Sequence, residues 1–127
     1  MTKLLYLLLI VALTGCITSK KTRKELKPKT NISNYRFSVS FISIGSGTDI
    51  KAKQQFDQFI KQFGLRNNVE LSYETGLWGR EGECDYCFKL SKLDKNQQET
   101  FISETKEALK GSNLVRYKEY SNCGLNN

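Results

Sequence analysis

Histidine is absent from this chain of 127 residues, and its absence limits the chemistry that the protein can perform. Histidine titrates near neutral pH and is the commonest metal ligand in proteins. Without it, serine and cysteine nucleophiles lack their usual general base, and we expect no metal or other cofactor. Catalysis would fall to carboxylates such as Glu81, Glu83 and Asp85. Nothing in the sequence suggests a pocket around them, so a small carboxylate-based enzyme is the less favoured interpretation.

Proline occurs once, as Pro28, and the longest apolar run, from Leu4 to Leu13, has ten residues. A membrane-spanning helix needs about 20 apolar residues, so this run is too short to be one. The run follows a short basic start and ends at small residues. This order is typical of a secretory signal peptide, which we expect over residues 1–15. The alternative is a buried helix or a true membrane anchor.

The end of this signal, Leu13-Thr14-Gly15-Cys16, resembles the lipobox of bacterial lipoproteins. The resemblance implies cleavage after Gly15 and a diacylglycerol on the sulfur of Cys16. Each buried methylene contributes about 0.8 kcal/mol, so two or three acyl chains hold a protein on a membrane almost permanently. The resemblance therefore implies a lipid-anchored protein of the cell envelope. Ile17 stands where an aspartate would favour the inner membrane, which implies the outer membrane in a Gram-negative cell.

The formal net charge of +7 suggests nucleic-acid binding until the charges are located. Residues 17–34 carry a net charge of +5, and residues 35–127 carry +1. The basic segment is interpreted as a flexible tether, over residues 16–34 with the lipidated cysteine, that lies within reach of an anionic surface. Because the folded part is nearly neutral and the protein is expected to be exported, we expect no nucleic-acid partner.

Residues 35–123 are predicted to form one domain, followed by a tail over 124–127. Strands with alternating polar and apolar residues are expected near 35–41, 69–74, 83–90 and 114–120. A first helix begins near Ser46 or Thr48 and ends at Gly64, and a second begins after Asp94, with Gln97 completing a capping box. The order βαββαβ predicts a ferredoxin-like α+β fold, with two helices on one face of an antiparallel sheet of strand order 4-1-3-2.

The buried faces follow from the same periodicity. The first strand turns Tyr35, Phe37, Val39 and Phe41 inward, while Ile42 and Ile44 continue it with the opposite parity. The outward positions hold no aromatic platform of the kind that stacks on bases, so a solvated sheet face is expected. These outward positions are Arg36, Ser38, Ser40, Glu83, Asp85, Cys87 and Lys89.

The glycine-rich segment 75–82 is the best candidate for a binding site, because it is predicted to be a hairpin loop. It holds Leu77, Trp78 and Arg80, and tryptophan and arginine are the residues most enriched at interface hot spots. The alternative is that Trp78 covers the end of the sheet and Arg80 pairs with Glu81 or Glu83. A second glycine turn, Gly45–Asp49, is interpreted as an ordinary capped turn before a helix, not an anion site.

Three cysteines remain once Cys16 is assigned to lipid: Cys84, Cys87 and Cys123. An oxidising envelope favours a disulfide, but the predicted fold places Cys123 too far from Cys84. Either Cys123 lies in a tail that folds back, or the thiols are free. The spacing of Cys84 and Cys87 resembles redox and zinc motifs, yet it falls in a strand and lacks further ligands.

These observations favour a non-catalytic module that binds an envelope protein or peptide. The alternative is an inhibitor or immunity-type lipoprotein that blocks one enzyme or toxin.

Overall fold

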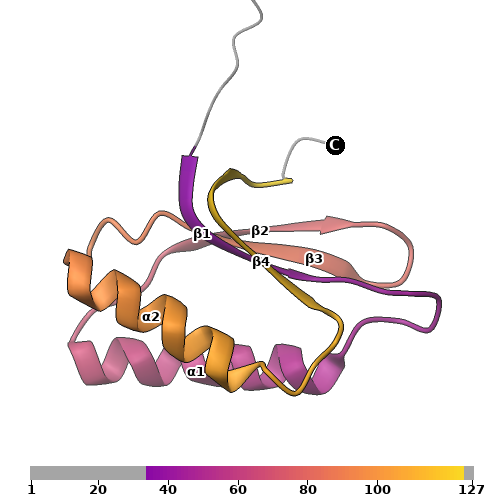
Figure 1. Ribbon diagram of the computed structural model, residues 1–127, viewed down its shortest axis with the longest axis horizontal. Coiled ribbons are helices and arrows are strands. Elements are labelled where there is room, and N and C mark those ends of the chain that lie inside the picture. Colours follow the sequence, from indigo (N-terminus) through magenta and orange to yellow (C-terminus); the bar gives the residue numbers. More distant parts are fainter. Residues whose placement is uncertain (1–33, 125–127) are drawn as a thin grey trace, which may run out of the picture. The chain divides into compact units, whose positions relative to one another are not determined.

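The computed structural model describes residues 34–124 (Figure 1). The expected signal peptide, Cys16, the tether before Asn34 and residues 125–127 lie outside the described residues. The predicted α+β fold is confirmed, and its elements follow the order βαββαβ. These are β1 (Asn34–Phe41), α1 (Ile50–Asn67), β2 (Tyr73–Trp78), β3 (Glu83–Phe88), α2 (Lys95–Ala108) and β4 (Val115–Asn122).

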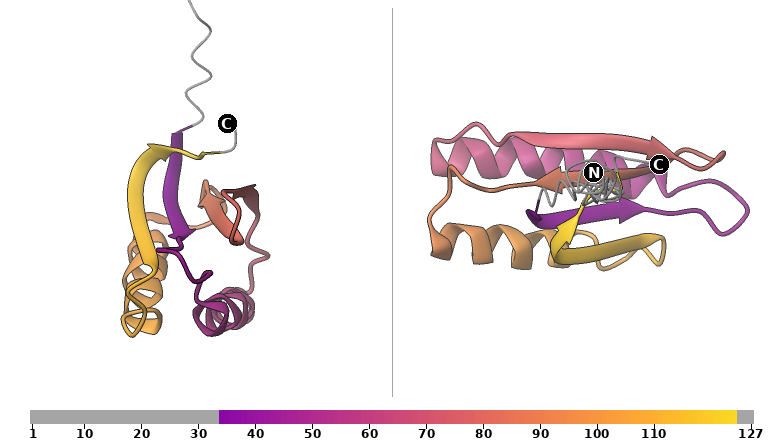
Figure 2. Two further views of the ribbon diagram at one scale, coloured as in Figure 1. Left: turned by 90° about the vertical axis from the view of Figure 1, so that its right-hand side faces the viewer. Right: turned by 90° about the horizontal axis from the view of Figure 1, so that it is seen from above.

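The four strands form one antiparallel sheet in the order β2-β3-β1-β4, which is the predicted order read from its other edge. Both helices cover the same face of this sheet, α1 beneath the β2–β3 side and α2 beneath the β1–β4 side (Figure 2). We call the covered face the inner face and the opposite one the outer face.

Phenylalanine dominates the core between the sheet and the helices. The Phe101 ring lies 5.1 Å from both the Phe63 and the Phe88 rings, and the Phe56 ring lies 5.3 Å from that of Tyr86. Most of the apolar positions that helical periodicity turns toward the sheet are buried, although Phe59 is half-buried and Ala108 is exposed. The fully buried phenylalanines are Phe37, Phe41, Phe56, Phe63, Phe88 and Phe101.

The helix ends follow capping chemistry. The predicted capping box of Asp94 and Gln97 is confirmed at the start of α2. The start of α1 was assigned to Ser46 or Thr48, and this was wrong: Asp49 is the cap, and its carboxylate accepts the Ala52 N–H at 2.9 Å. The predicted stop at Gly64 was also wrong. The helix continues to Asn67, because Asn68 adopts the left-handed conformation and bonds back to the last carbonyls.

The second strand begins and ends later than predicted. Residues 69–72 are outside it, and pairing with β3 runs from Tyr73 to Trp78, which lies opposite Glu83. Gly79 and Gly82, with φ of 71° and 86°, supply the tight turn that joins the strands. Because these two glycines suffice for the turn, the strand continues through residues that were predicted to be loop.

The start of β1 departs from simple alternation. Tyr35 was predicted to be buried, and it is, with 3% exposure, whereas Arg36 was predicted to face solvent, which was wrong. Arg36 is 8% exposed and reaches Glu99 on α2 at 2.6 Å and Glu119 on β4 at 2.8 Å. Tyr35 is buried outside the main core cluster, with the Lys89 ammonium 5.6 Å from its ring centre. Two neighbouring residues at the start of β1 are therefore both buried, which strict alternation does not allow for.

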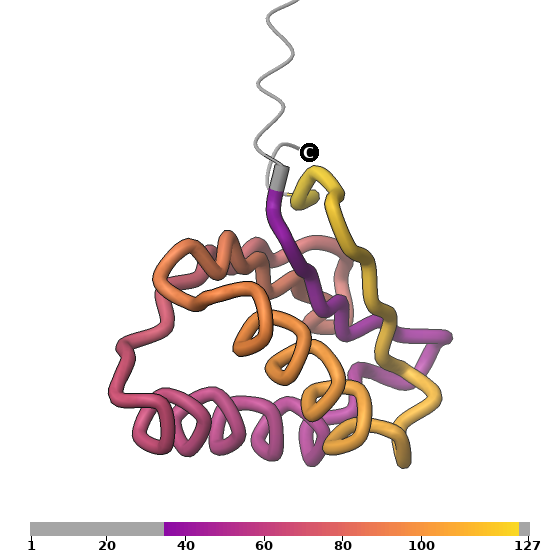
Figure 3. The backbone as a smooth tube through the Cα atoms, turned by 60° about the vertical axis from the view of Figure 1, so that its left-hand side comes forward, coloured from indigo at the N-terminus to yellow at the C-terminus, as the bar shows by residue number. Residues whose placement is uncertain are grey.

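A disulfide joins Cys87 on β3 to Cys123, whose Cα atoms are 5.9 Å apart. β4 bends at Tyr120, where φ is 49°, and the last residues of β4 lie beside the start of β1 (Figure 3). Of the two possibilities left open for Cys123, a tail that folds back or a free thiol, the structure therefore has the first. We call the segment 121–124 the strap, because it passes over β1 to reach β3.

The strap explains why the outer face is less solvated than predicted. Cys87 faces outward as expected, yet it is fully buried, and Ser38 is 4% exposed with its hydroxyl 3.3 Å from that of Ser121. Cys84 faces inward and is a buried free thiol, and burial raises its pKa. Among residues 34–124, Cys84 is therefore the one unpaired thiol, and its burial in the core shelters it from oxidants.

Candidate functional site

Two loops that are distant in sequence meet at one end of the sheet. They are the β2–β3 turn at 79–82 and the segment 42–49 between β1 and α1, and Figure 1 shows both at the same end of the domain. The Ser43 hydroxyl donates to the Glu81 carboxylate, which also accepts the Gly47 N–H at 3.4 Å. The Ser43 oxygen accepts the Gly45 N–H at 3.1 Å. These bonds fix one loop against the other.

The predicted site residues lie at this end, although two of them belong to a strand. Trp78, the last residue of β2, is 37% exposed, and its ring N–H donates to the Asp85 carboxylate at 3.1 Å. Arg80 is exposed, and no ion pair joins it to another residue of the described range 34–124. The alternative in which Trp78 covers the end of the sheet is thus partly correct, since the ring is directed back toward Asp85 on β3. The expected pairing of Arg80 with Glu81 or Glu83 is not observed.

Leu77 and Ile44 supply the exposed apolar surface at this end. Leu77 is 83% exposed and Ile44 is 79% exposed. The sequence analysis named Leu77 and missed Ile44, which it extended into the strand. β1 ends at Phe41. The change in the polar–apolar alternation at Ile42 and Ile44 was therefore the sign that the strand had ended and that an apolar loop follows. We call Ile44, Leu77, Trp78 and Arg80 the hairpin end.

The three carboxylates once weighed for catalysis serve as hydrogen-bond acceptors. Glu83 accepts the Glu81 N–H at 2.8 Å, and Asp85 accepts from Trp78. The Ser43 hydroxyl and the Gly47 N–H hold the pKa of Glu81 below its ordinary value. A general acid needs a raised carboxyl pKa, so the hydrogen bonds around Glu81 work against that role. The carboxylates brace the hairpin end.

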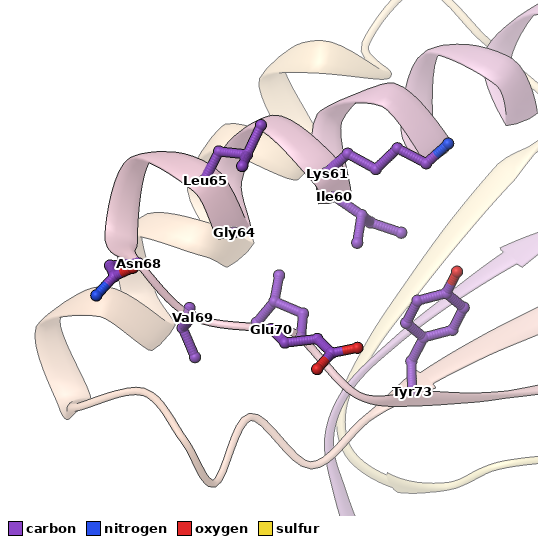
Figure 4. Close-up of a pocket in the computed structure, with 9 residues that line it drawn as sticks. Ile60, Lys61, Gly64, Leu65, Asn68, Val69, Glu70 and Tyr73 are labelled. Atoms are coloured by element: carbon purple, nitrogen blue, oxygen red, sulfur yellow. The ribbon is translucent and has the colours of Figure 1, made fainter.

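A groove of about 730 Å³ lies between the second half of α1 and the extended segment that leads into β2 (Figure 4). Ile60 from α1 and Tyr73 from β2 point into it from opposite sides. The helix approaches this segment closely: a Cβ on Gly64 would lie 2.6 Å from the Val69 oxygen, and the Val69 N–H donates to the Gly64 oxygen at 2.9 Å. The lining is mostly apolar and comprises Ile60, Lys61, Gly64, Leu65, Asn68, Val69, Glu70, Leu71 and Tyr73.

Sequence reasoning missed this groove because it placed residues 69–72 inside the sheet. Within residues 34–124, no cluster of acidic and cysteine side chains is arranged to hold a metal ion. Across the same range, neither helix has the length and hydropathy of a bilayer-crossing segment.

Comparison with known proteins gives one partial match. No family model and no solved structure matches the chain. The ATP-dependent zinc metalloprotease FtsH 1 of Alkaliphilus metalliredigens is 35% identical over 81 residues, which are 62% of this chain and 13% of that protein. The match thus spans about an eighth of the relative's length, and it describes a similarity to a part of that protein.

Proposed function

We propose that this protein is a lipid-anchored, non-catalytic module of the bacterial cell envelope that binds a protein partner through its hairpin end. The observation that carries the binding role is the hairpin end itself. Two largely exposed aliphatic side chains, Ile44 and Leu77, lie at the end that also carries Trp78 and Arg80. Exposed apolar surface with a polar rim is characteristic of protein interaction sites.

The position of this surface in the fold suits an anchored protein. The chain enters the domain at Asn34, and the hairpin end lies beyond Phe41, at the other end of β1. Seven residue steps of strand separate these ends by roughly 23 Å. The 17 residues between Cys16 and Asn34 can span at most about 60 Å when extended. A partner could therefore be held well clear of the membrane surface.

The disulfide supports the expected location. Disulfides persist in oxidising compartments, such as the bacterial periplasm and the cell surface, and are rare in the cytosol. The Cys87–Cys123 bond is therefore consistent with export, as the lipobox implies. The similarity to FtsH 1 covers 13% of that protein, so it is no ground for assigning the activity of the protease to this chain.

Crosslinked pull-down from native membranes tests the binding role. Trp78→Ala and Arg80→Ala should each lose the partner recovered with the wild-type chain. Tyr120→Ala is the matched control, because Tyr120 is 70% exposed on β4 near Asn34, away from the hairpin end. Equal recovery with all three variants would sink the hairpin-end proposal. If the partner is an enzyme that loses its activity on binding, the result supports the alternative that this protein is an inhibitor.

Metabolic labelling with a fatty-acid analogue tests the anchor separately. The wild-type chain should carry the label and sediment with membranes, and Cys16→Ala should do neither. A labelled Cys16→Ala variant would contradict the lipidation site.

A further inference from the structure

The two edges of the sheet are built differently. An open strand edge presents unpaired backbone groups and pairs with another strand unless charges, kinks or covering segments prevent it. β4 has such protection: Arg116 and Lys118 are exposed, and the strand bends at Tyr120. Its Glu119 is also tied to Lys106 on α2 at 3.0 Å. This edge is therefore closed to a further strand.

β2, the opposite edge, has none of this protection. Its sequence, Tyr73–Trp78, contains no proline, lysine or arginine, and Glu74 is its one charged residue. Three large apolar side chains are exposed along it: Tyr73 by 41%, Leu77 by 83% and Trp78 by 37%. Among residues 34–124, no strand lies beyond it in the sheet. This edge is therefore available for pairing.

We propose that β2 pairs antiparallel with β2 of a second copy of this chain, about a two-fold axis through Thr75, to form a continuous eight-stranded sheet. Residues directly opposite each other in an antiparallel pair lie on the same face. With Thr75 opposite itself, Tyr73 of each copy lies opposite Leu77 of the other. An isologous contact of this kind closes at a dimer.

Charge and packing select this register over its neighbours. A pairing centred on Glu74 would place two carboxylates directly opposite each other, which is unfavourable. A pairing centred on Gly76 would place Glu74 opposite Trp78 and separate Tyr73 from Leu77. The pairing centred on Thr75 sets Glu74 opposite Gly76, where no side chain competes for space. The pairing centred on Thr75 is also the register that brings Tyr73 and Leu77, the two apolar residues of the inner face, opposite each other.

The groove gives the paired leucine a place to pack. Tyr73 forms one wall of the groove, and its ring lies 5.5 Å from the Tyr86 ring and 5.2 Å from the Phe88 ring. Leu77 of the second copy would cover the exposed side of Tyr73 and extend this aromatic cluster across the axis. The same contact would reduce the present 83% exposure of Leu77, and Ile44, Trp78 and Arg80 of the hairpin end lie outside it.

The flank of α1 beside this edge carries charges of both signs and does not contribute to the choice of register. Lys53, Asp57 and Lys61 stand one helical turn apart, and α1 lies beneath β2 in Figure 2. Asp57 is level with Thr75, because Tyr86 pairs with Thr75 and donates its hydroxyl to Asp57 at 3.1 Å. About this axis, Asp57 of one copy lies opposite Asp57 of the other and Lys53 lies opposite Lys61, so each carboxylate has lysines only at the diagonal positions.

Disulfide trapping in membranes tests the axis directly. In a Cys84→Ser background, Thr75→Cys of the full chain should give a crosslinked dimer on mild oxidation, because the two introduced thiols face each other. Lys118→Cys, an exposed position on the β4 edge, is the matched control and should crosslink far less. Equal crosslinking at both positions, or none at Thr75→Cys, would overturn the proposal.

Association of the full chain in detergent provides the second measurement. Wild type should sediment as a dimer in the micromolar range, and Leu77→Asp should weaken association at least tenfold. Trp78→Ala should leave association intact, because Trp78 lies on the outer face, whereas the hairpin-end proposal predicts that it loses the partner. A wild-type chain that stays monomeric refutes the dimer and leaves the proposal of partner binding at the hairpin end unaffected. If Leu77→Asp does not fold, the trapping result decides.

Discussion

Breaking the Cys87–Cys123 bond should cost this domain a large part of its stability. The change to make is Cys123→Ser, because Cys123 is partly exposed whereas Cys87 is fully buried. Serine at position 123 removes the crosslink without burying a hydroxyl in the sheet face. The strap would then be held by weaker contacts, such as the one between Ser38 and Ser121.

The magnitude follows from the chain that the disulfide closes. The two cysteines are separated by 36 residues. Constraining a loop of that length in the unfolded state corresponds to about 4 kcal/mol at room temperature in the chain-entropy account, and measured values tend to be lower. We therefore expect Cys123→Ser to lower the free energy of unfolding by about 3–4 kcal/mol.

Urea denaturation with and without reductant checks this value. Reductant should lower the unfolding free energy of the wild type to that of Cys123→Ser and leave the variant itself unchanged. The free thiol of Cys84 is present in both proteins, so it cancels in the comparison. A loss below about 1 kcal/mol, or an equal effect of reductant on both proteins, would refute the loop-closure reasoning.

Two further predictions concern single contacts. Hydrogen bonds from Arg36 and then Lys106 lower the pKa of Glu119, so its contribution to stability is present above the pKa of an unfolded glutamate and is lost as the pH falls through the lowered value. Glu119→Gln should cost about 1 kcal/mol near neutral pH, after screening by solvent, and the gap to wild type in pH-dependent unfolding should close in acid; a gap independent of pH would contradict this. Gly64→Ala should destabilise the domain by about 1–3 kcal/mol in the same assay, since its Cβ would meet the Val69 carbonyl at 2.6 Å. Gly111→Ala, which has open space, should be nearly neutral, and equal losses at both glycines would exclude a steric cause.

The topology could be predicted from the sequence because it depends on periodicity. Phe56, Ile60 and Phe63 repeat at helical spacing, and all three are buried against the sheet. Alternation in β1 and β3 identified the inner face of the sheet in the same way. These patterns record burial, which is a property of each residue and its near neighbours.

The exact ends of β2 could not be predicted in this way. Residues 69–72 alternate like a strand, yet the approach of Gly64 to Val69 holds this segment against α1 instead. That contact belongs to the tertiary structure. The glycines of 76–82 indicated a long loop, whereas Gly79 and Gly82 alone form the turn. The groove and the strand position of Leu77 and Trp78 were missed for this reason.

The disulfide partner was also beyond the reach of local patterns. The predicted fold placed Cys123 far from Cys84 and left the pairing open, and the structure pairs Cys123 with Cys87. The choice of Cys87 depends on the bend at Tyr120, a residue that rarely adopts a positive φ. Tyr120 lies over Arg36, whose guanidinium carbon is 4.4 Å from the ring centre. Arg36 was itself predicted to face solvent, so the contact that accompanies the bend could not be foreseen.

The place of β1 in the sheet has a mechanical consequence for an anchored protein. A pull between the membrane and a partner at the hairpin end would enter at Asn34, run along β1 and pass to β3 through the five paired positions from Phe37 to Phe41. Hydrogen bonds of antiparallel strands lie across the strand direction, so this load would shear all of them together instead of unzipping them singly. The strap adds a covalent bridge over β1, from the end of β4 to β3. The β1–β3 ladder and the disulfide together would therefore carry tension between the two ends of the domain.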